Sequence, residues 1–184
     1  MDCTDTKRFD ELREFMNFLE AKGELLKVNQ EINSKYELAA VQMKVLDEKD
    51  KAVLFTNVDG MNQQIVGNIY SSRRMISYMF GVPQKELLEE VKNLKDARPY
   101  QVKYVEDAPC QEIVVKDIGD LKEIIPITWN CKYDSGYFIT SAIIVCKDPE
   151  TGKTNSAICR LEYKKEHLTV QLVPNQHTSI IFQK

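Results

Sequence analysis

The sequence is poor in the residues from which common catalytic centres are built. Its 184 residues include only two histidines, His167 and His177, and contain no H-E-x-x-H pair and no nucleophile elbow. The seven glycines are scattered and form neither a G-x-G-x-x-G run nor a Walker sequence. Hydrolase, zinc-enzyme and glycine-loop nucleotide sites therefore have little support. If a phosphate-bearing cofactor binds, side chains together with a divalent metal ion are one way to hold it.

Cysteine pairs, basic charge and long apolar runs are equally limited. The five cysteines are odd in number and include no C-x-x-C pair, which argues against a disulfide framework and for free thiols in a reducing compartment. The net charge of −3 gives no basic field for nucleic acid or an anionic membrane. No apolar run approaches the roughly 20 residues of a membrane helix, and the charged N-terminus does not look like a signal peptide. We expect a cytoplasmic protein without nucleic-acid or membrane partners.

The sequence pattern changes near residue 98. Before it, helical spacing alternates with short strand-like runs, and Ser34 with Glu37 has the spacing of a capping box that starts a helix. After it, strand-like runs are separated by polar turns; these runs are 101–105, 112–115, 138–146, 156–162 and 167–173. We predict an α+β fold, with a small N-terminal α/β domain over residues 1–98 and a barrel or sandwich over residues 99–184.

The β-rich half contains three polar residues of interest, Asn155, Arg160 and His177. Asn155 and Arg160 are five residues apart, which puts them on opposite faces of one regular strand unless Asn155 lies in the preceding turn. Arg160 is the only charge in the run SAICRL, where it is costly without a carboxylate or phosphate partner; it could also face solvent from a barrel strand. His177 is either a structural or helix-capping residue or a metal ligand. The spacing alone leaves these alternatives open.

Several longer runs resemble one family in its own order. They are FDELREFMNFLEAKGELLKVNQEI, IVGNIYSSRRMISYMFGV, APCQEIVV, DLKEIIPITWN and GYFITSAIIVCKDPETGKTNSAICRLEY. Together they cover the chain from about Phe9 to His177 and resemble the start of UbiD-type decarboxylases. The resemblance implies an N-terminal α/β domain followed by a split β-barrel similar to flavin reductases, of which this chain holds a part. It also implies carboxy-lyase activity on unsaturated or aromatic carboxylic acids, with prenylated FMN, Mn²⁺ or another divalent metal, and K⁺.

The resemblance also assigns roles to individual residues. Asn155 and His177 match two metal ligands of the family, and Arg160 matches a catalytic arginine that pairs with a glutamate near the flavin. The positions that line the flavin match, besides Arg160, Thr140, Ile158 and Gln176. Ala157 stands where the family usually has Gly or Ser, a minor departure because alanine is also small.

The resemblance places the remaining acids of the site beyond Lys184. These are the third metal ligand and the two glutamates that work with the arginine. We therefore expect the chain to be a segment or subunit of a decarboxylase that is incomplete alone. A partner chain that supplies the missing half, or a homo-oligomer, is compatible with this interpretation. The alternative is a non-catalytic module that binds flavin or supports a partner.

Overall fold

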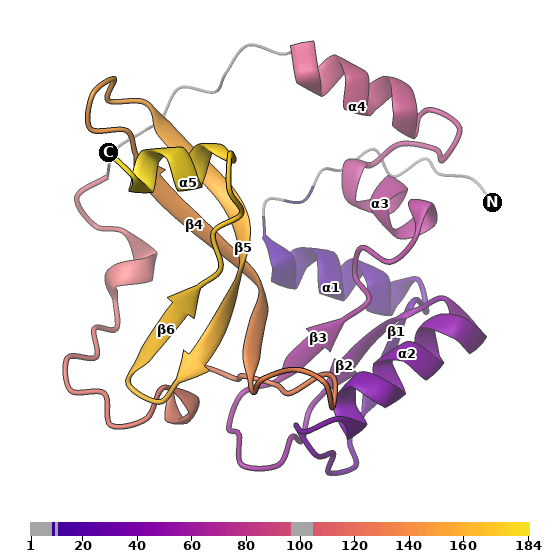
Figure 1. Cartoon of the computed structure of the whole chain (residues 1–184). Helices are drawn as coiled ribbons and strands as arrows, with labels where there is room; N and C mark the ends of the chain where they lie inside the picture. The colour runs from indigo at the N-terminus through magenta and orange to yellow at the C-terminus, as the bar shows by residue number, and fades with distance from the viewer. Residues whose placement is uncertain (1–8, 10, 97–104) are drawn as a thin grey trace. The chain divides into compact units, whose positions relative to one another are not determined.

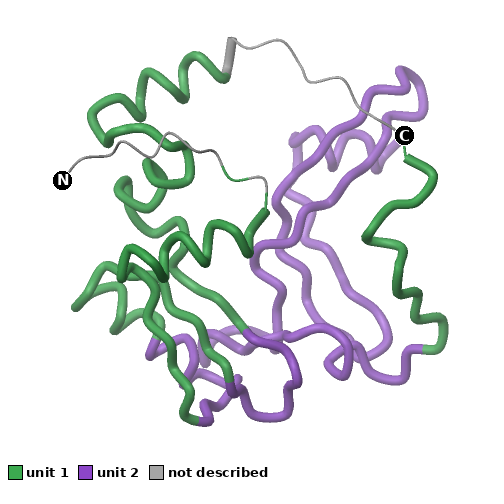
Figure 2. The backbone as a smooth tube through the Cα atoms, turned by 180° about the vertical axis from the view of Figure 1, so that it is seen from behind, with its two compact units in different colours: residues 1–30, 42–56, 65–117 green, residues 31–41, 57–64, 118–184 purple. Residues whose placement is uncertain are grey.

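The structure is a computed structural model that describes residue 9, residues 11–96 and residues 105–184 (Figure 1). These residues divide into two compact units (Figure 2). Unit 1 comprises residues 1–30, 42–56 and 65–117, and unit 2 comprises residues 31–41, 57–64 and 118–184. The described helices include none that is long and apolar enough to cross a membrane. The domain boundary predicted between residues 98 and 99 lies outside the described residues and stays a prediction.

Unit 1 is built on a small mixed sheet. Strands β1 (Leu25–Val28) and β2 (Ala52–Phe55) are parallel, and β3 (Ile65–Gly67) pairs antiparallel with β2. Strand β2 lies in the centre and is buried along its whole length, as its apolar sequence AVLF requires. Between β1 and β2 the chain passes through helix α2 (Glu37–Lys49), since parallel neighbours need a crossover connection.

Helix α1 (Leu12–Ala21) contributes an apolar face to the core of unit 1. Phe15 and Leu19 of this helix are buried together with Ala52 of β2 and Met75 of helix α3 (Arg73–Phe80). Helix α3 begins where the Ser72 side chain accepts a hydrogen bond from the Met75 backbone N–H. It is followed by helix α4 (Leu87–Asp96).

Helix α2 does not start with the predicted capping box. The Glu37 carboxylate accepts a hydrogen bond from the backbone N–H of Asn33, at 2.8 Å, and not from that of Ser34. Ser34 is buried, and its carbonyl oxygen accepts from the backbone N–H of Trp129. Tyr36 adopts a left-handed conformation with φ of 71°, which adds a turn before the helix and moves the reciprocal bond back by one residue.

Unit 2 contains a separate antiparallel sheet in the order β4-β5-β6. Its strands are β4 (Phe138–Lys147), β5 (Thr154–Lys164) and β6 (His167–Val170). The predicted hairpin turn joins β4 to β5, where Gly152 N–H donates to the Asp148 carbonyl and the Asp148 carboxylate accepts from Glu150 N–H. Helix α5 (His177–Phe182) follows β6 and contacts β4 and β5 (Figure 1). Within the described residues this sheet is not closed, so the split β-barrel stays a prediction.

The strand predicted at residues 112–115 is wrong. A short 3₁₀ turn, η1 (Pro109–Gln111), precedes an irregular segment in which Ile113 and Val114 are exposed. An apolar run becomes a strand only if another strand pairs with it, and the described residues provide no such partner here. Residues 101–104 of another predicted strand lie outside the described residues.

The only tryptophan joins early and late segments of unit 2. Trp129 lies 5.6 Å from the Tyr36 ring and 5.3 Å from the Tyr137 ring, measured between centroids. Its indole N–H donates to the Cys131 carbonyl at 2.8 Å. A second short turn, η2 (Leu121–Glu123), lies earlier in the same unit. Trp129 is half-buried and makes the contacts expected of a core anchor.

Candidate functional site

The two faces of the β4–β5 hairpin differ in exposure. The register pairs Cys146 with Asn155 and Ile144 with Ala157, so these side chains share one face, which we call the covered face. Residues on this face are half-buried, and helix α5 contacts both strands. The opposite face, the open face, includes Ile143, Val145 and Ile158, whose exposed fractions are 65%, 67% and 78%. Three large aliphatic side chains that remain this exposed form an apolar surface available to a ligand or to another chain.

Asn155 lies on the covered face and is tied to the start of helix α5. It is the second residue of β5, so it does not lie in the turn. Its Nδ2 donates to the hydroxyl of Thr178, 2.9 Å away, and Thr178 is buried. The adjacent His177 is the first residue of α5 and is exposed. Gln176, the N-cap, makes no side-chain cap bond. The start of α5 therefore brings Asn155, Gln176 and His177 into one neighbourhood.

Arg160 lies on the open face, opposite an irregularity in β4. The register shifts between Ile139, which pairs with Leu161, and Ala142, which pairs with Cys159. Two residues, Thr140 and Ser141, therefore oppose Arg160 alone, which defines a β-bulge. Such bulges often occur beside functional sites, where they change the direction of a side chain.

The Arg160 side chain is held by a carboxylate and an aromatic ring. Its Nη2 lies 2.7 Å from Oδ1 of Asp134, and its Cζ lies 3.7 Å from the centroid of the Phe138 ring. Arg160 is 38% exposed and Asp134 17%, so the ion pair is partly shielded from water. Nε of Arg160 is buried and has no hydrogen-bond partner among the described residues. The charge that seemed costly in an apolar run is therefore paired, with part of its hydrogen-bonding capacity unused.

The six candidate residues fall into two groups, one on the open face and one at the start of α5. Arg160 and Ile158 lie on the open face, with the exposed Thr140 in the bulge. The other three, Asn155, Gln176 and His177, lie at the start of α5. Asn155 and Arg160, which are five residues apart, therefore point to opposite faces, as expected on a regular strand.

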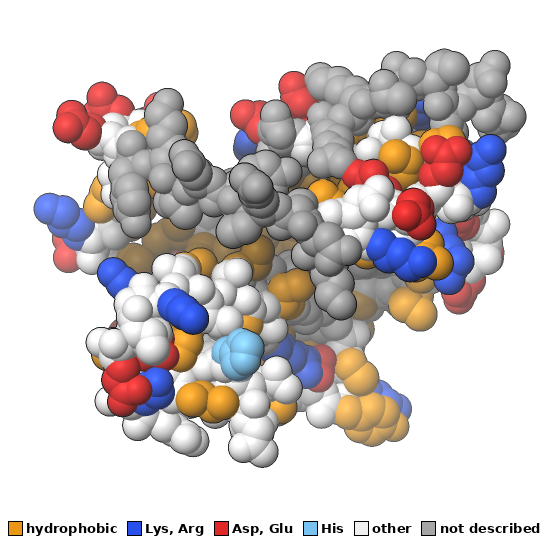
Figure 3. Space-filling view, turned by 90° about the horizontal axis from the view of Figure 1, so that it is seen from above, with side chains coloured by type: hydrophobic (Ala, Val, Ile, Leu, Met, Phe, Trp, Pro, Cys, Tyr) orange, Lys and Arg blue, Asp and Glu red, His pale blue; other side chains and the backbone are white. Residues whose placement is uncertain are grey.

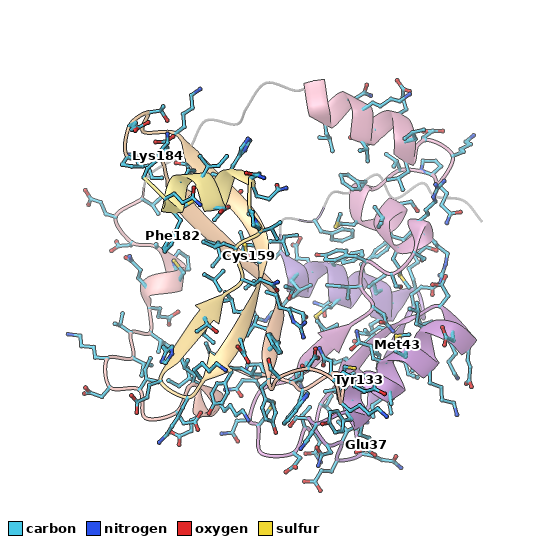
Figure 4. All side chains as sticks on the ribbon, in the orientation of Figure 1. Glu37, Met43, Tyr133, Cys159, Phe182 and Lys184 are labelled. Atoms are coloured by element: carbon cyan, nitrogen blue, oxygen red, sulfur yellow. The ribbon has the colours of Figure 1, made fainter. Side chains whose placement is uncertain are left out.

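The sequence reasoning missed Asp134 and Phe138. Arg160 needed a partner, but many carboxylates could have supplied it, because the sequence does not show which loop returns to β5. Asp134 lies in the segment immediately before β4, and Phe138 is the first residue of that strand. Figure 4 labels Cys159, the β5 neighbour of Arg160, and Phe182 on α5.

The donors for a metal ion are present only in part. Among the residues that the structure describes, no group of three or more His, Cys, Asp or Glu side chains could hold a metal. Asn155 and His177 could supply one oxygen and one nitrogen donor, which suits manganese or magnesium, but two ligands do not make a protein site. The open face, by contrast, presents exposed aliphatic side chains and no metal donors among those named here.

A second polar cluster in unit 2 has shifted acidities. The Tyr163 hydroxyl donates to Oδ1 of Asp120 at 2.7 Å, which lowers the pKa of Asp120 and raises the pKa of Tyr163 to about 12. Burial lowers the pKa of Lys122, whose Nζ lies 2.9 Å from the centroid of the Tyr137 ring. In the view of Figure 3, acidic and basic side chains are interspersed, in agreement with the small net charge.

Comparison with known families and proteins gives a consistent result. Residues 16–95 match the 3-octaprenyl-4-hydroxybenzoate carboxy-lyase N-terminal domain, and residues 103–184 match the Rift-related domain of the same enzyme family. A phenolic acid decarboxylase of Bacillus subtilis is 32% identical over 94% of this chain and 39% of its own length. An anhydromevalonate phosphate decarboxylase of Methanosarcina mazei is 30% identical over 94% of this chain and 38% of its own.

Solved structures agree with this comparison. An evolved dimeric form of the UbiD-class enzyme HmfF from Pelotomaculum thermopropionicum, in complex with prFMN, superposes with a TM-score of 0.87 at 28% identity. The match covers 95% of this chain and 41% of that one. The closed form of the Sedimentibacter hydroxybenzoicus vanillic acid decarboxylase gives a TM-score of 0.86 at 27% identity, covering 96% of this chain and 40% of that one.

The chain therefore spans about two fifths of the length of the curated relatives that it matches. Its two matched segments are consecutive domains of one enzyme family and leave few residues unmatched. The order of the quoted sequence runs, the mixed α/β fold and the relatives all point to that family. The chain belongs to the UbiD family of carboxy-lyases.

Proposed function

We propose that this chain is a segment or subunit of a UbiD-type carboxy-lyase that decarboxylates aromatic or unsaturated carboxylic acids with prenylated FMN. The observation that carries the proposal is the open face of the β4–β5 hairpin. There an exposed aliphatic surface around Ile158 adjoins an arginine, Arg160, which retains unused donors. The named relatives support the reaction class, since they include a phenolic acid decarboxylase and a vanillic acid decarboxylase.

The open face is proposed to receive the ring system of the flavin. Ile143 and Ile158 are directly paired across the strands and would pack against a planar ring, removing their exposed surface from water. Thr140 in the bulge would border the ring. Bound prenylated FMN would supply the electron sink when carbon dioxide leaves.

The start of helix α5 is proposed to hold the phosphate end of the cofactor. Asn155 and His177 would bind a divalent metal, with Mn²⁺ preferred, and Gln176 would contact the flavin. The hydrogen bond from Asn155 to Thr178 uses Nδ2, so it leaves the amide oxygen, the atom suited to a metal, available. We also propose that K⁺ binds at the same phosphate.

Arg160 is proposed as the residue that binds a carboxylate near the flavin. A guanidinium can donate to two carboxylates from its different N–H groups, and Nη2 of Arg160 is paired with Asp134 while Nε has no partner among the described residues. A residue outside this chain, on a further segment or on a partner, would supply the second carboxylate and the proton transfer. We also propose that residues 99–184 form part of a split β-barrel, which further strands would close.

A titration of the full chain with FMN or prenylated FMN, followed by flavin fluorescence, tests the proposal. Ile158→Glu places a charge on the open face and is expected to weaken binding about tenfold or more. Ile113→Glu is the matched control, because Ile113 is 80% exposed but lies outside the hairpin. Equal effects of the two variants, or no binding by the unmodified chain, would count against a flavin site on this face.

The alternative function is a non-catalytic flavin-binding or partner-supporting module, for which the exposed open face would serve equally. Turnover separates the two functions. With prenylated FMN and Mn²⁺ the chain alone is expected to release no carbon dioxide from aromatic acids. If adding the unmatched remainder of the Bacillus subtilis relative restores turnover, the lyase proposal is supported. If flavin binds but no complement restores turnover, the module is the better description.

A further inference from the structure

We propose that Asp134 is the positioning residue for Arg160: its carboxylate fixes the guanidinium over Phe138 and so determines which edge is offered to a bound carboxylate. The proposal rests on the function proposed above for Arg160, but the role of Asp134 follows from the geometry of unit 2 alone. The ion pair of 2.7 Å and the ring contact of 3.7 Å restrain the guanidinium from two directions.

The segment that carries Asp134 is itself anchored to β5. The Ser135 hydroxyl donates to Oε1 of Glu162 at 2.6 Å, and the Tyr137 carbonyl accepts from the Tyr163 backbone N–H at 3.0 Å. The backbone N–H of Asp134 donates to the Cys131 carbonyl at 3.0 Å. Asp134 therefore reaches Arg160 from a segment held on both sides, which limits how far its carboxylate can move.

A second carboxylate on the same face is already engaged. Glu162 lies two residues beyond Arg160 on β5 and therefore points to the same side of the sheet. Its Oε1 accepts from the Ser135 hydroxyl at 2.6 Å and lies 2.9 Å from Nζ of Lys164. The Ser135 hydrogen bond, followed by the Lys164 contact, lowers the pKa of Glu162. The assignment of Asp134 as the arginine's partner is thus unambiguous in this structure.

The pairing leaves a defined part of the arginine for a ligand. Asp134 engages Nη2, whereas Nε is buried and has no hydrogen-bond partner among the described residues. The charges of Asp134 and Arg160 cancel, so the pair does not attract anions by net charge. Removing Asp134 therefore has two opposite effects on a bound carboxylate: it adds a net positive charge, which strengthens attraction, and it frees the guanidinium, which weakens directional binding.

The two effects make the substitution Asp134→Asn decisive. If Asp134 only offsets charge, Asp134→Asn should tighten the binding of benzoate, a simple aromatic carboxylate. If Asp134 positions Arg160, the same substitution should weaken benzoate binding, on the order of tenfold. Asp134→Glu retains the charge and should restore part of the affinity. Asp117→Asn, at an exposed position of unit 1, makes the same charge change as a control and should leave affinity unchanged.

A readout that does not depend on ligand binding comes from NMR of ¹⁵N-arginine-labelled full chain. Slow guanidinium rotation should give resolved Nη signals for Arg160, identified by their loss in Arg160→Lys. Arg74, held by Glu24 and Asp50, serves as the internal reference. In Asp134→Asn the Arg160 signals should average while those of Arg74 stay resolved, which also shows that the variant is folded.

The outcomes separate the inference from the proposed function. Averaged Arg160 signals and weaker benzoate binding in Asp134→Asn, with recovery in Asp134→Glu, support the positioning role. Arg160 signals that are unchanged in Asp134→Asn, or tighter benzoate binding, overturn it. If the Arg160 signals average as expected but the unmodified chain binds neither flavin nor benzoate, the positioning contact stands and the proposed function fails.

Discussion

The assignment of the two hairpin faces can be tested with two substitutions on one strand, Leu161→Ala and Ile158→Ala. Leu161 faces the covered side and is 9% exposed, whereas Ile158 faces the open side and is 78% exposed. Burying a complete Leu or Ile side chain contributes about 1.5–3 kcal/mol, and a cavity in a packed region adds to the loss. We expect Leu161→Ala to lower the free energy of unfolding by about 2–4 kcal/mol.

The same arithmetic gives a small effect for Ile158→Ala. Only about a fifth of Ile158 is removed from water, which corresponds to about 0.3–0.7 kcal/mol, and the lower strand propensity of alanine brings the loss to about 1 kcal/mol at most. Urea unfolding followed by the fluorescence of Trp129, the only tryptophan, reports on the unit that contains both positions. Equal losses, or a larger loss for Ile158→Ala, would refute the assignment of the faces.

Two further predictions concern charged and polar groups. Replacing Arg74 with Met leaves the largely buried Glu24 carboxylate without its ion-pair partner, so we expect a loss of about 2–4 kcal/mol in urea unfolding, and Glu24→Gln in the same background should recover part of it. Because the pKa of Tyr163 is raised to about 12, the Tyr163–Asp120 hydrogen bond stabilises the fold fully below the ordinary tyrosine pKa of about 10 and loses its contribution as the pH rises toward 12. Ultraviolet titration of tyrosinate should show one phenol that ionises near 12, and its pKa should return toward 10 in Asp120→Asn. An unshifted phenol in the unmodified chain would contradict this prediction.

The sequence was most informative where the signal is local. The start of α3 at Ser72 and the turn at Asp148 depend on hydrogen bonds between residues at most four positions apart, so short sequence patterns can indicate them. The opposite orientation of Asn155 and Arg160 likewise follows from strand geometry. Family membership was predicted from the order of the sequence runs, and the matched domains confirm it.

Features that depend on distant partners were not predictable in the same way. The bulge opposite Arg160 arises from the register between two strands, and no residue type in β4 indicates its position. The ion pair with Asp134 joins residues 26 positions apart. The apolar residues at 112–115 look like a strand in isolation, but the described fold gives them no neighbouring strand. The positions of the metal and flavin contacts remain predictions.

The bulge at Thr140 and Ser141 also has a consequence for how this hairpin can change during evolution. Before the bulge, the even-numbered Phe138 shares a face with Glu162, and after it the odd-numbered Ile143 shares that face with Ile158. The bulge thus shifts by one residue which side chains of β4 point to each face. Deleting one of its two residues would leave a single residue opposite Arg160, so the strand would alternate regularly and Phe138 would keep the face that it shares with Glu162. A single deletion at the bulge is therefore compatible with the strand pairing on both sides of it, whereas a deletion elsewhere in β4 would exchange the faces of the residues on one side of the deletion.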